Sequence, residues 1–293
     1  MNGIINLLKP PGISSNGAVV AVRKLLGVKK VGHTGTLDPG ASGVLVICLG
    51  KATKLSDYLM QSQKEYIAEI TFGMRTDTQD SYGKVLEEKD AEISFEQFKS
   101  VLPAFSGRIE QITPCYSAAK QNGEALYKLA LKGKAIAEKR RNVEIFEIEA
   151  IEQTAKNRFL FRTVCEKGTY IRTLCEDIGA ALGVPAYMSM LIRTKTSGFA
   201  IEDSVTLDEL TALYEGGNIE EVFIPVDKVL DKYEKLLVPE EFRIRLANGN
   251  TIYLENMLHH KNGLYRVYCG GVFIGTGNLQ DGSVVIDTHL MGD

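Results

Sequence analysis

The chain lacks tryptophan altogether and has few of the residues that bind metals or form disulfides. Its 293 residues include five cysteines and four histidines. The cysteines are Cys48, Cys115, Cys165, Cys175 and Cys269, and the histidines are His33, His259, His260 and His289. No Cys-x-x-Cys pair occurs, and no histidine stands at metal-ligand spacing from a cysteine. We therefore expect reduced thiols and no metal site.

Long hydrophobic runs are missing as well. No apolar stretch reaches the roughly 18 residues of a membrane span, and Met1–Pro10 lacks the basic start and apolar core of a signal peptide. We expect a cytoplasmic protein that makes no contact with a membrane. Nucleotide-binding fingerprints are also absent: at Gly50-Lys51, Ala52 replaces the Ser or Thr of a phosphate-binding loop, and Leu45 replaces its first glycine.

Charge is nearly balanced over the whole chain, but one segment is basic. The net charge is −3, and the hydrophobic and charged fractions, 44% and 24%, are those of an ordinary globular protein. Between residues 120 and 141 the basic residues are Lys120, Lys128, Lys132, Lys134, Lys139, Arg140 and Arg141, and the acidic residues are Glu124 and Glu138. Seven minus two gives a local charge of +5. This segment is either the solvated face of a helix or an extended contact with RNA.

The most distinctive stretch is Gly32-His33-Thr34-Gly35-Thr36-Leu37-Asp38-Pro39-Gly40-Ala41-Ser42-Gly43, which leads into the apolar run Val44–Leu49. It places one carboxylate, Asp38, among glycines, a proline and small hydroxyl residues. Glycine permits positive φ and close approach of a ligand, and Pro39 favours an extended Asp38. Asp38 is therefore either a turn-forming residue before a core strand or a functional carboxylate on a shaped loop.

This stretch closely resembles the catalytic motif of the TruB-type tRNA pseudouridine synthases, and the resemblance implies that Asp38 is the essential catalytic residue. Lys64 and Tyr66 match the K-x-Y motif of the same family. The alternation from Lys64 to Phe72 predicts a strand with Tyr66 on its apolar face, where a tyrosine is ordinarily part of the core. The resemblance implies that Tyr66 also stacks on the target base. It is in addition a candidate for the deprotonation at C5 that ends the reaction.

A second motif, Gly168-Thr169-Tyr170-Ile171-Arg172-Thr173-Leu174, matches the family without gaps. By that resemblance Arg172 pairs with Asp38, and Tyr170 packs on the target nucleotide. An arginine at the start of a helix is electrostatically unfavourable, which also favours a specific anionic partner over a surface position. Leu191 lies in a segment similar to the family's LRRT, and it would form an apolar wall of the base pocket.

Three further substrate-binding residues are implied by weaker matches. Lys9 begins a family-like KPPGISS segment, and it either contacts phosphate, orders the active-site loop or is an ordinary surface lysine. His33 would fill the space that the target base vacates. Lys120 ends the segment from Gln111, which resembles the start of an insertion that clamps the RNA arm, with Thr113 in place of a family proline.

The resemblance covers nearly the whole chain and implies an α+β fold. It consists of a mixed-sheet catalytic domain at residues 1–230, with an RNA-clamping insertion at about residues 108–142. Beyond about Leu230 the pattern changes to short strand-like runs separated by glycines. Residues 235–293 resemble a small, β-rich, PUA-type RNA-binding domain.

The implied activity is isomerisation of uridine 55 in the T-loop of tRNA to pseudouridine, with the T-arm of tRNA as the partner. No cofactor is implied, because a C1′–N1 bond is exchanged for a C1′–C5 bond without ATP or a redox change. The first step stays open: Asp38 attacks C1′, adds to C6 or removes a proton from C2′. No protein partner is implied, and we expect a monomer.

Two other classes of function remain. An RNA-binding or tRNA-folding module with a silent site would not need Asp38, Tyr66 and Arg172 together. A glycosidase-like hydrolase usually needs two carboxylates, and no second candidate accompanies Asp38 in the sequence.

Overall fold

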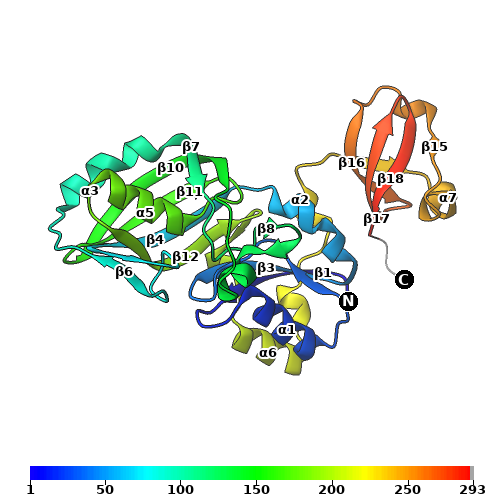
Figure 1. Ribbon diagram of the computed structural model, residues 1–293. Helices are drawn as coiled ribbons and strands as arrows, with labels where there is room; N and C mark the ends of the chain where they lie inside the picture. Colours follow the sequence, from blue (N-terminus) through cyan, green and yellow to red (C-terminus); the bar gives the residue numbers. More distant parts are fainter. Residues whose placement is uncertain (291–293) are drawn as a thin grey trace.

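The computed structural model describes residues 1–290, which form a larger and a smaller sheet joined by a linker (Figure 1). Within this described part the larger sheet has nine strands. The order along the sheet is β1 (Gly3–Lys9), β3 (Ser42–Leu49), β12 (Ala186–Thr196), β4 (Lys64–Phe72), β11 (Arg158–Cys165), β10 (Arg140–Ala155) and β7 (Gly107–Ile112). β2 (Val31–His33) pairs with β3, and β13 (Phe199–Ala200) pairs with β12. β3 and β12 run parallel while the other neighbours are antiparallel, which confirms the predicted mixed sheet.

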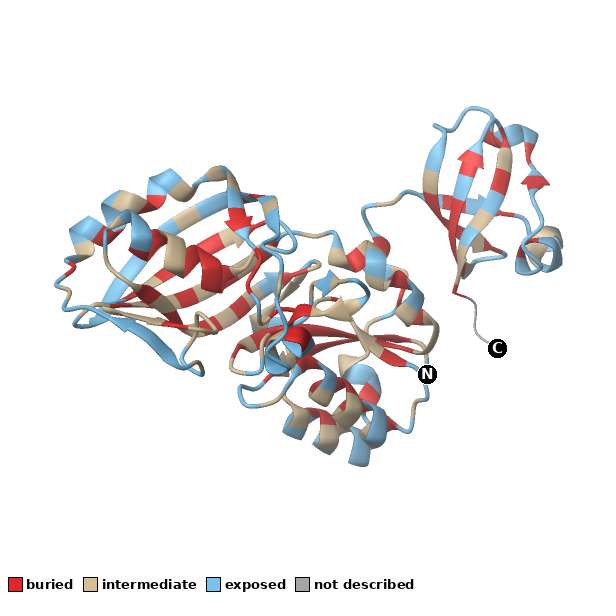
Figure 2. Cartoon of the chain, viewed as in Figure 1, coloured by how far each residue is buried: buried red, intermediate tan, exposed pale blue. Residues whose placement is uncertain are grey.

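Strand β3 is apolar on both faces because both faces are covered. Leu45 and Ile47 pack against α1 (Ser15–Leu26) and α6 (Leu207–Glu215). Val44 and Val46 face the opposite side, where η1 (Gly50–Leu55) and α2 (Ser56–Met60) cover them. Figure 2 shows the buried strand between exposed helix surfaces. A strand buried on two sides needs a continuous apolar run rather than an alternating one, as Val44–Leu49 has.

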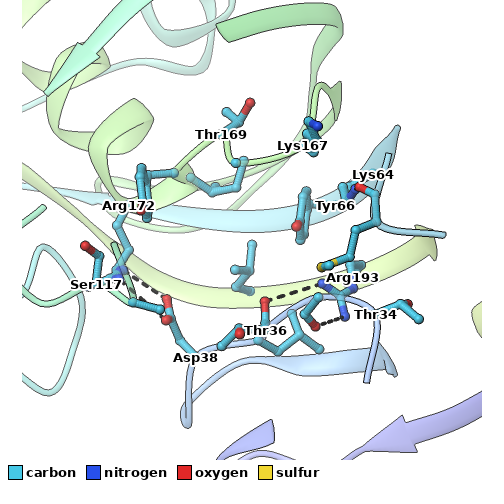
Figure 3. A pocket seen from close by; sticks show the side chains of 18 of the residues that line it. Thr34, Thr36, Asp38, Lys64, Tyr66, Ser117, Lys167, Thr169, Arg172 and Arg193 are labelled. Carbon is cyan, nitrogen blue, oxygen red and sulfur yellow. Dashed lines mark hydrogen bonds and ion pairs between the residues drawn. The ribbon is translucent and has the colours of Figure 1, made fainter. Parts of the chain in front are cut away.

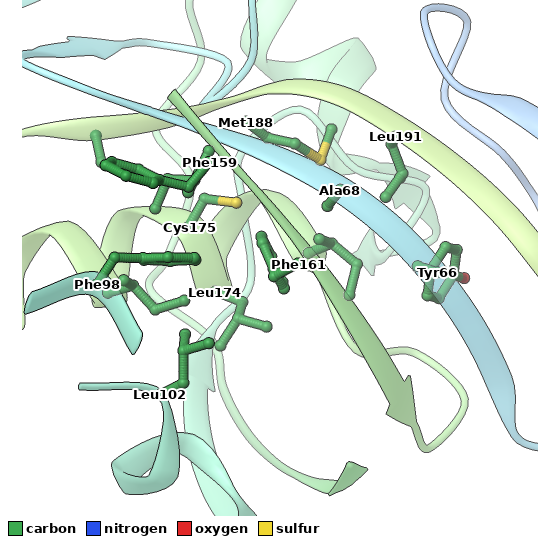
Figure 4. Close-up of a cluster of buried hydrophobic side chains, with 14 of the residues drawn as sticks. Tyr66, Ala68, Phe98, Leu102, Phe159, Phe161, Leu174, Cys175, Met188 and Leu191 are labelled. Carbon is green, nitrogen blue, oxygen red and sulfur yellow. The ribbon is translucent and has the colours of Figure 1, made fainter. Parts of the chain in front are cut away.

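The other half of the sheet packs on α3 (Phe95–Val101) and α5 (Ile171–Ala181). Phe98 and Phe159 stack at the centre of this core, with ring centroids 5.0 Å apart. Figure 4 shows Tyr66 at the end of the same cluster, with its hydroxyl group pointing away from the phenylalanines. The alternating burial of β4 thus continues from the core into the site region.

The segment between β7 and β10 leaves the sheet. It contains β8 (Lys120–Gln121), β9 (Glu124–Ala125) and α4 (Leu126–Leu131). A second excursion is the hairpin of β5 (Met74–Thr76) and β6 (Val85–Glu88). Short 3₁₀ turns elsewhere are η2 (Leu102–Phe105), η3 (Ile201–Asp203), η4 (Ile219–Val222), η5 (Lys228–Leu230), η6 (Glu240–Phe242) and η7 (Glu255–Met257).

The smaller sheet has its own core and five strands within the described residues. Their order is β14 (Lys235–Val238), β16 (Gly263–Cys269), β17 (Val272–Gln280), β18 (Ser283–His289) and β15 (Ile252–Tyr253), and α7 (Arg243–Ala247) lies beside them. The predicted domain runs to residue 293, so its last three residues lie outside the described part. Lys54 Nζ donates to the carbonyl oxygen of His289 at 3.0 Å, and the Tyr58 hydroxyl bonds Asp287, which joins β18 to the larger body. No helix in residues 1–290 has the length and apolarity of a membrane span.

Gly43 sets the close contact between β3 and β12, and replacing it should destabilise the fold. Its φ is +109°, and a Cβ there would lie 2.2 Å from the carbonyl oxygen of Arg193. We expect Gly43→Ala to lower the free energy of unfolding by more than the about 1–3 kcal/mol of a strained φ alone. Urea unfolding would measure this. Gly183→Ala is the control, because Gly183 has φ +72° but open space around its Cβ; equal losses in the two variants would contradict the packing argument.

Candidate active site

The loop between β2 and β3, residues 34–41, is fixed by hydrogen bonds from α1 and its preceding turn. Ser15 Oγ accepts from Leu37 N at 2.8 Å and donates to the carbonyl oxygen of Leu37 at 2.9 Å. Gly12 N and Lys9 Nζ both donate to the carbonyl oxygen of Pro39, at 2.9 and 3.3 Å. Asp38 lies between these two anchored residues, so its backbone position is set by the scaffold rather than by the loop alone.

Arg193 holds the same loop from the side of the sheet. The side chain is fully buried. Its Nε donates to the carbonyl oxygen of Val44 at 2.8 Å, and its Nη2 and Nη1 donate to those of Gly35 and Thr36 at 3.1 and 3.5 Å (Figure 3). No role for Arg193 was predicted from the sequence. The alternation of side chains along a strand could have predicted its position, because Arg193 lies two residues after Leu191 and therefore shares its face.

Asp38 and Arg172 form an ion pair at one end of the site (Figure 3). Arg172 Nε lies 2.9 Å from Asp38 Oδ2, and Nη2 lies 3.5 Å from Oδ1. The guanidinium also donates to the carbonyl oxygens of Thr78 and Tyr116, both at 2.9 Å. Arg172 is the second residue of α5, and its side chain is only 5% exposed. The sequence-based prediction that it faces an anion rather than solvent agrees with this geometry.

Burial and the ion pair act on the Asp38 carboxyl in opposite directions. Burial raises its pKa, and Arg172 lowers it without fully compensating, so the net pKa lies above the ordinary value of 3.8. Asp80 raises the pKa further, and Lys9 lowers it. The arginine therefore keeps a partly desolvated carboxylate available in its charged form.

A cavity of about 340 Å³ opens beside the ion pair. This volume lies in the range of about 300–1,000 Å³ that small-molecule sites occupy. The lining residues include Thr34, Gly35, Thr36, Leu37, Asp38, Met60, Lys64, Tyr66, Ser117, Arg141, Lys167, Tyr170, Arg172, Leu191 and Arg193. Five of the eight residues predicted from the sequence are brought together here: Asp38, Tyr66, Tyr170, Arg172 and Leu191. They come from the β2–β3 loop, β4, the start of α5 and β12.

The Tyr66 hydroxyl is a neutral phenol in this environment. Burial raises its pKa above the ordinary value of 10, and interactions with Arg193 oppose the shift. The Tyr66 ring lines the cavity together with Tyr170 and Leu191. Tyr170 is held in place by Gln111, which accepts from Tyr170 N at 3.0 Å and donates to its carbonyl oxygen at 3.1 Å.

The other three predicted residues do not line the cavity. Lys9 is fully buried and donates to the carbonyl oxygens of Pro10, Ile13 and Pro39. This arrangement matches the loop-ordering alternative and leaves no ammonium exposed for a phosphate. His33 lies on β2, where its Nδ1 accepts from Gly35 N at 3.2 Å; burial lowers its pKa. Lys120 is exposed on β8.

The cavity wall is strongly cationic, which the sequence analysis did not predict. Its lining has five basic residues, Lys64, Arg141, Lys167, Arg172 and Arg193, against one carboxylate, Asp38. No local pattern gathers these residues, because they come from four separate parts of the sheet and its loops. Among residues 1–290 no group of three or more His, Cys, Asp or Glu side chains is placed to hold a metal ion.

A lone carboxylate held by an arginine in a tyrosine-walled, cationic cavity defines a site for chemistry on a planar, anionic substrate such as a nucleotide. Sequence comparison gives the family. The model described as "TruB family pseudouridylate synthase (N terminal domain)" matches residues 23–171, and "tRNA pseudouridylate synthase B C-terminal domain" matches residues 172–237. The chain belongs to the TruB family of pseudouridylate synthases.

Individual relatives match over most of their length. The chain is 44% identical over 285 residues to the tRNA pseudouridine synthase B of Alkaliphilus oremlandii, which covers 96% of this chain and 94% of the relative. It is 46% identical over 259 residues to that of Pelotomaculum thermopropionicum, with 87% and 82% covered. Among solved structures, a chain in a Cbf5-Nop10-Gar1 complex is 26% identical with a TM-score of 0.74, and 99% of this chain and 85% of that one are covered.

Replacing Arg172 by methionine should move the acidic limb of the pH–rate profile for pseudouridine formation to higher pH. Methionine keeps the bulk but removes the charge that lowers the pKa of Asp38, so burial then raises that pKa further. At neutral pH the turnover should fall on the order of 100-fold, as expected for a misplaced catalytic group. Arg75→Met is the control, because the Arg75 side chain is 41% exposed and pairs with Glu87 and Glu176 rather than with Asp38. An unshifted limb with weaker RNA binding would mean that Arg172 acts on the RNA instead.

Proposed function

We propose that this chain isomerises uridine 55 in the T-loop of tRNA to pseudouridine, with Asp38 as the group that begins glycosidic cleavage. Two observations support tRNA as the substrate: the chain belongs to a pseudouridylate synthase family, and its relatives are named tRNA pseudouridine synthase B. The observation that carries the proposal is the Asp38–Arg172 pair at the wall of a cavity that also presents Tyr66 and Tyr170.

The reaction breaks one bond and makes another. The C1′–N1 bond breaks, the uracil turns, and C1′ joins C5. C5 loses a proton to solvent and N1 gains one, so the substrate and the product have equal mass. Attack on C1′, addition to C6 and removal of a C2′ proton all require Asp38 as a carboxylate, which is the form that Arg172 stabilises.

The cavity suits one base taken out of its stack. A uridine in a folded loop has to be flipped out before an enzyme can reach its glycosidic bond. Tyr66, Tyr170 and Leu191 offer flat and apolar walls, and aromatic stacking contributes about 1–3 kcal/mol per base. His33, beside the catalytic loop, would occupy the place that the base leaves.

The basic segment supports contact with the T-arm, although its cations are not equivalent. Lys132 pairs with Glu124, and Arg140 pairs with Glu110 and Glu138. The remaining cations have no carboxylate within ion-pair distance among residues 1–290: Lys120, Lys128, Lys134, Lys139 and Arg141. We infer that this second group, which includes Lys120, contacts the phosphates of the T-arm.

The smaller sheet has a core of its own, and two core clusters of the larger sheet contain none of its residues, which supports a division of labour along the chain. A further cluster beside β3 also includes Phe273 and Leu290. We propose a catalytic domain at residues 1–230, with the RNA-clamping insertion at about 108–142, and a PUA-like RNA-binding domain at residues 235–293. The protein would act as a cytoplasmic monomer. The exposed free thiol of Cys115 suits a reducing compartment.

Asp38→Asn should reduce isomerisation by about 10³-fold or more, as loss of an essential group does, while tRNA affinity changes little. The assay incubates purified protein with unmodified tRNA and maps pseudouridine by position. Turnover of the variant within about tenfold of wild type would rule out the assigned role of Asp38.

The same assay separates the alternatives. Release of free uracil would indicate a hydrolase, because isomerisation leaves the mass unchanged. Tight tRNA binding by the wild-type chain without any modified uridine would indicate a binding or folding module, and either result contradicts the proposal.

A fragment ending at residue 230 should fold and keep the chemical step on an isolated T-arm hairpin, but bind full-length tRNA more weakly than the whole chain. The larger sheet retains two core clusters that draw no residue from the smaller sheet. The hairpin is too short to reach a second domain, so the affinity difference should shrink for it. A fragment that is folded by circular dichroism yet inactive on the hairpin would contradict the domain division.

A further inference from the structure

Arg141 lies at the lip of the cavity, where two neighbours fix its guanidinium. Its Cζ lies 5.8 Å from the centroid of the Tyr170 ring, a cation–π arrangement. A Cβ at Gly168 would lie 2.5 Å from Arg141 Nη2 and 2.8 Å from Nη1, so the guanidinium rests directly on the glycine backbone. Gly168 has φ +80°, a conformation that also favours glycine. The motif that supplies Tyr170 and Arg172 therefore also leaves room for Arg141.

Arg140 and Arg141 are neighbours in the basic segment, but their guanidinium groups have different partners. Arg140, one residue earlier, is exposed and pairs with Glu110 and Glu138. Arg141 has no carboxylate within ion-pair distance in residues 1–290, and its buried Nε has no hydrogen-bond partner there. A buried donor without a partner is energetically unfavourable. A fixed, uncompensated guanidinium at the lip of a cavity is thus ready for an anion that the chain itself does not provide.

Lys167 is a second cation at the entrance of the cavity without a carboxylate partner among residues 1–290. Lys167, also on the lining, bonds the Gln61 side chain rather than a carboxylate. Deeper cations are already engaged, since Arg172 pairs with Asp38 and Arg193 donates to backbone carbonyls. Arg141 and Lys167 therefore carry the free positive charge of the entrance. A uracil ring is neutral, so the anionic part of a nucleotide that meets this entrance is its phosphate, which a guanidinium fork binds in bidentate geometry.

We propose that Arg141 binds one of the two phosphates flanking the flipped uridine and so positions the nucleotide over Asp38. This role rests on the proposed function, because it requires an RNA strand whose target base enters the cavity. The opposing interpretation is structural: Arg141 only packs on Tyr170 and Gly168 to hold the start of α5.

The test compares binding and turnover of a T-arm hairpin by wild type, Arg141→Met, Arg141→Lys and the matched control Arg140→Met. Arg141→Met should weaken the hairpin Kd about 10- to 100-fold, the range for a charged hydrogen bond. The slope of log K against log salt should become shallower by about 0.7, as expected for one phosphate contact in a single strand. Arg141→Lys should recover part of the affinity, and Arg140→Met should stay within about twofold of wild type, since Glu110 and Glu138 already neutralise it.

Hairpins with a single methylphosphonate, 5′ or 3′ of the target uridine, separate the two interpretations. One of these neutral linkages should weaken wild-type binding by the same factor as Arg141→Met. The same linkage should then cost Arg141→Met little more, because the two changes remove one interaction. Equal sensitivity of wild type and Arg141→Met to both linkages would overturn the proposal and assign Arg141 a structural role.

The test can still decide whether Arg141 binds a phosphate if one variant fails to fold or if the chain is inactive. If Arg141→Met does not fold, as judged by circular dichroism, the comparison of wild type with Arg141→Lys on the methylphosphonate hairpins decides instead, and additive losses overturn the proposal. Binding is measured apart from product formation. A wild-type chain that binds the hairpin but makes no pseudouridine contradicts the proposed function, whereas normal isomerisation with an unchanged Arg141→Met affinity contradicts only the assignment of Arg141.

Discussion

The guanidinium of Arg172 connects the Asp38 carboxylate to three other parts of the fold. It pairs with Asp38 and donates to the carbonyl oxygens of Thr78 and Tyr116, so α5, the loop after β5 and the segment between β7 and β8 all meet at one side chain. Breaking a fully buried ion pair costs about 3–5 kcal/mol. Because the Asp38 side chain is 35% exposed, the structural cost here is smaller. The larger consequence is chemical, since the arginine opposes the effect of burial on the carboxylate.

Further cations lie around the Asp38 carboxylate, in addition to Arg172. Lys9, Lys64 and Arg193 are buried, and the hydrogen bonds that they donate go to backbone carbonyls rather than carboxylates. Burial lowers the pKa of Lys9 and of Lys64 to about 8, so both remain largely charged at neutral pH. A low-dielectric site with oriented cations stabilises an anion without reorganising when the substrate arrives. It also supplies a field that attracts the phosphates of RNA.

Local patterns in the sequence predicted much of this architecture. The alternation of β4 placed Tyr66 on the apolar face, and the apolar run Val44–Leu49 predicted a core strand, which is β3. Motif resemblance brought Asp38 and Arg172 together although they are 134 residues apart. The places of Arg193 and Arg141 in the cavity wall were not predictable in this way, because their partners are backbone carbonyls, a glycine surface and a distant ring. Such contacts produce no recognisable pattern of residue spacing in the sequence. Lys9 is a residue whose burial the sequence does not reveal. A lysine at the end of a strand is ordinarily exposed, but three backbone carbonyl oxygens bind the Lys9 ammonium in the interior.

Direct titration of the Asp38 carboxyl tests the account most sharply. Carbon-13 NMR of aspartate-labelled protein, with Asp38→Asn used to assign the resonance, would follow this one group. The account predicts a pKa above 3.8 in the wild-type chain and a higher one in Arg172→Met, with the wild-type group ionised at neutral pH. A wild-type value at or below 3.8, or no change on removing the arginine, would contradict the claim that Arg172 keeps a desolvated carboxylate charged.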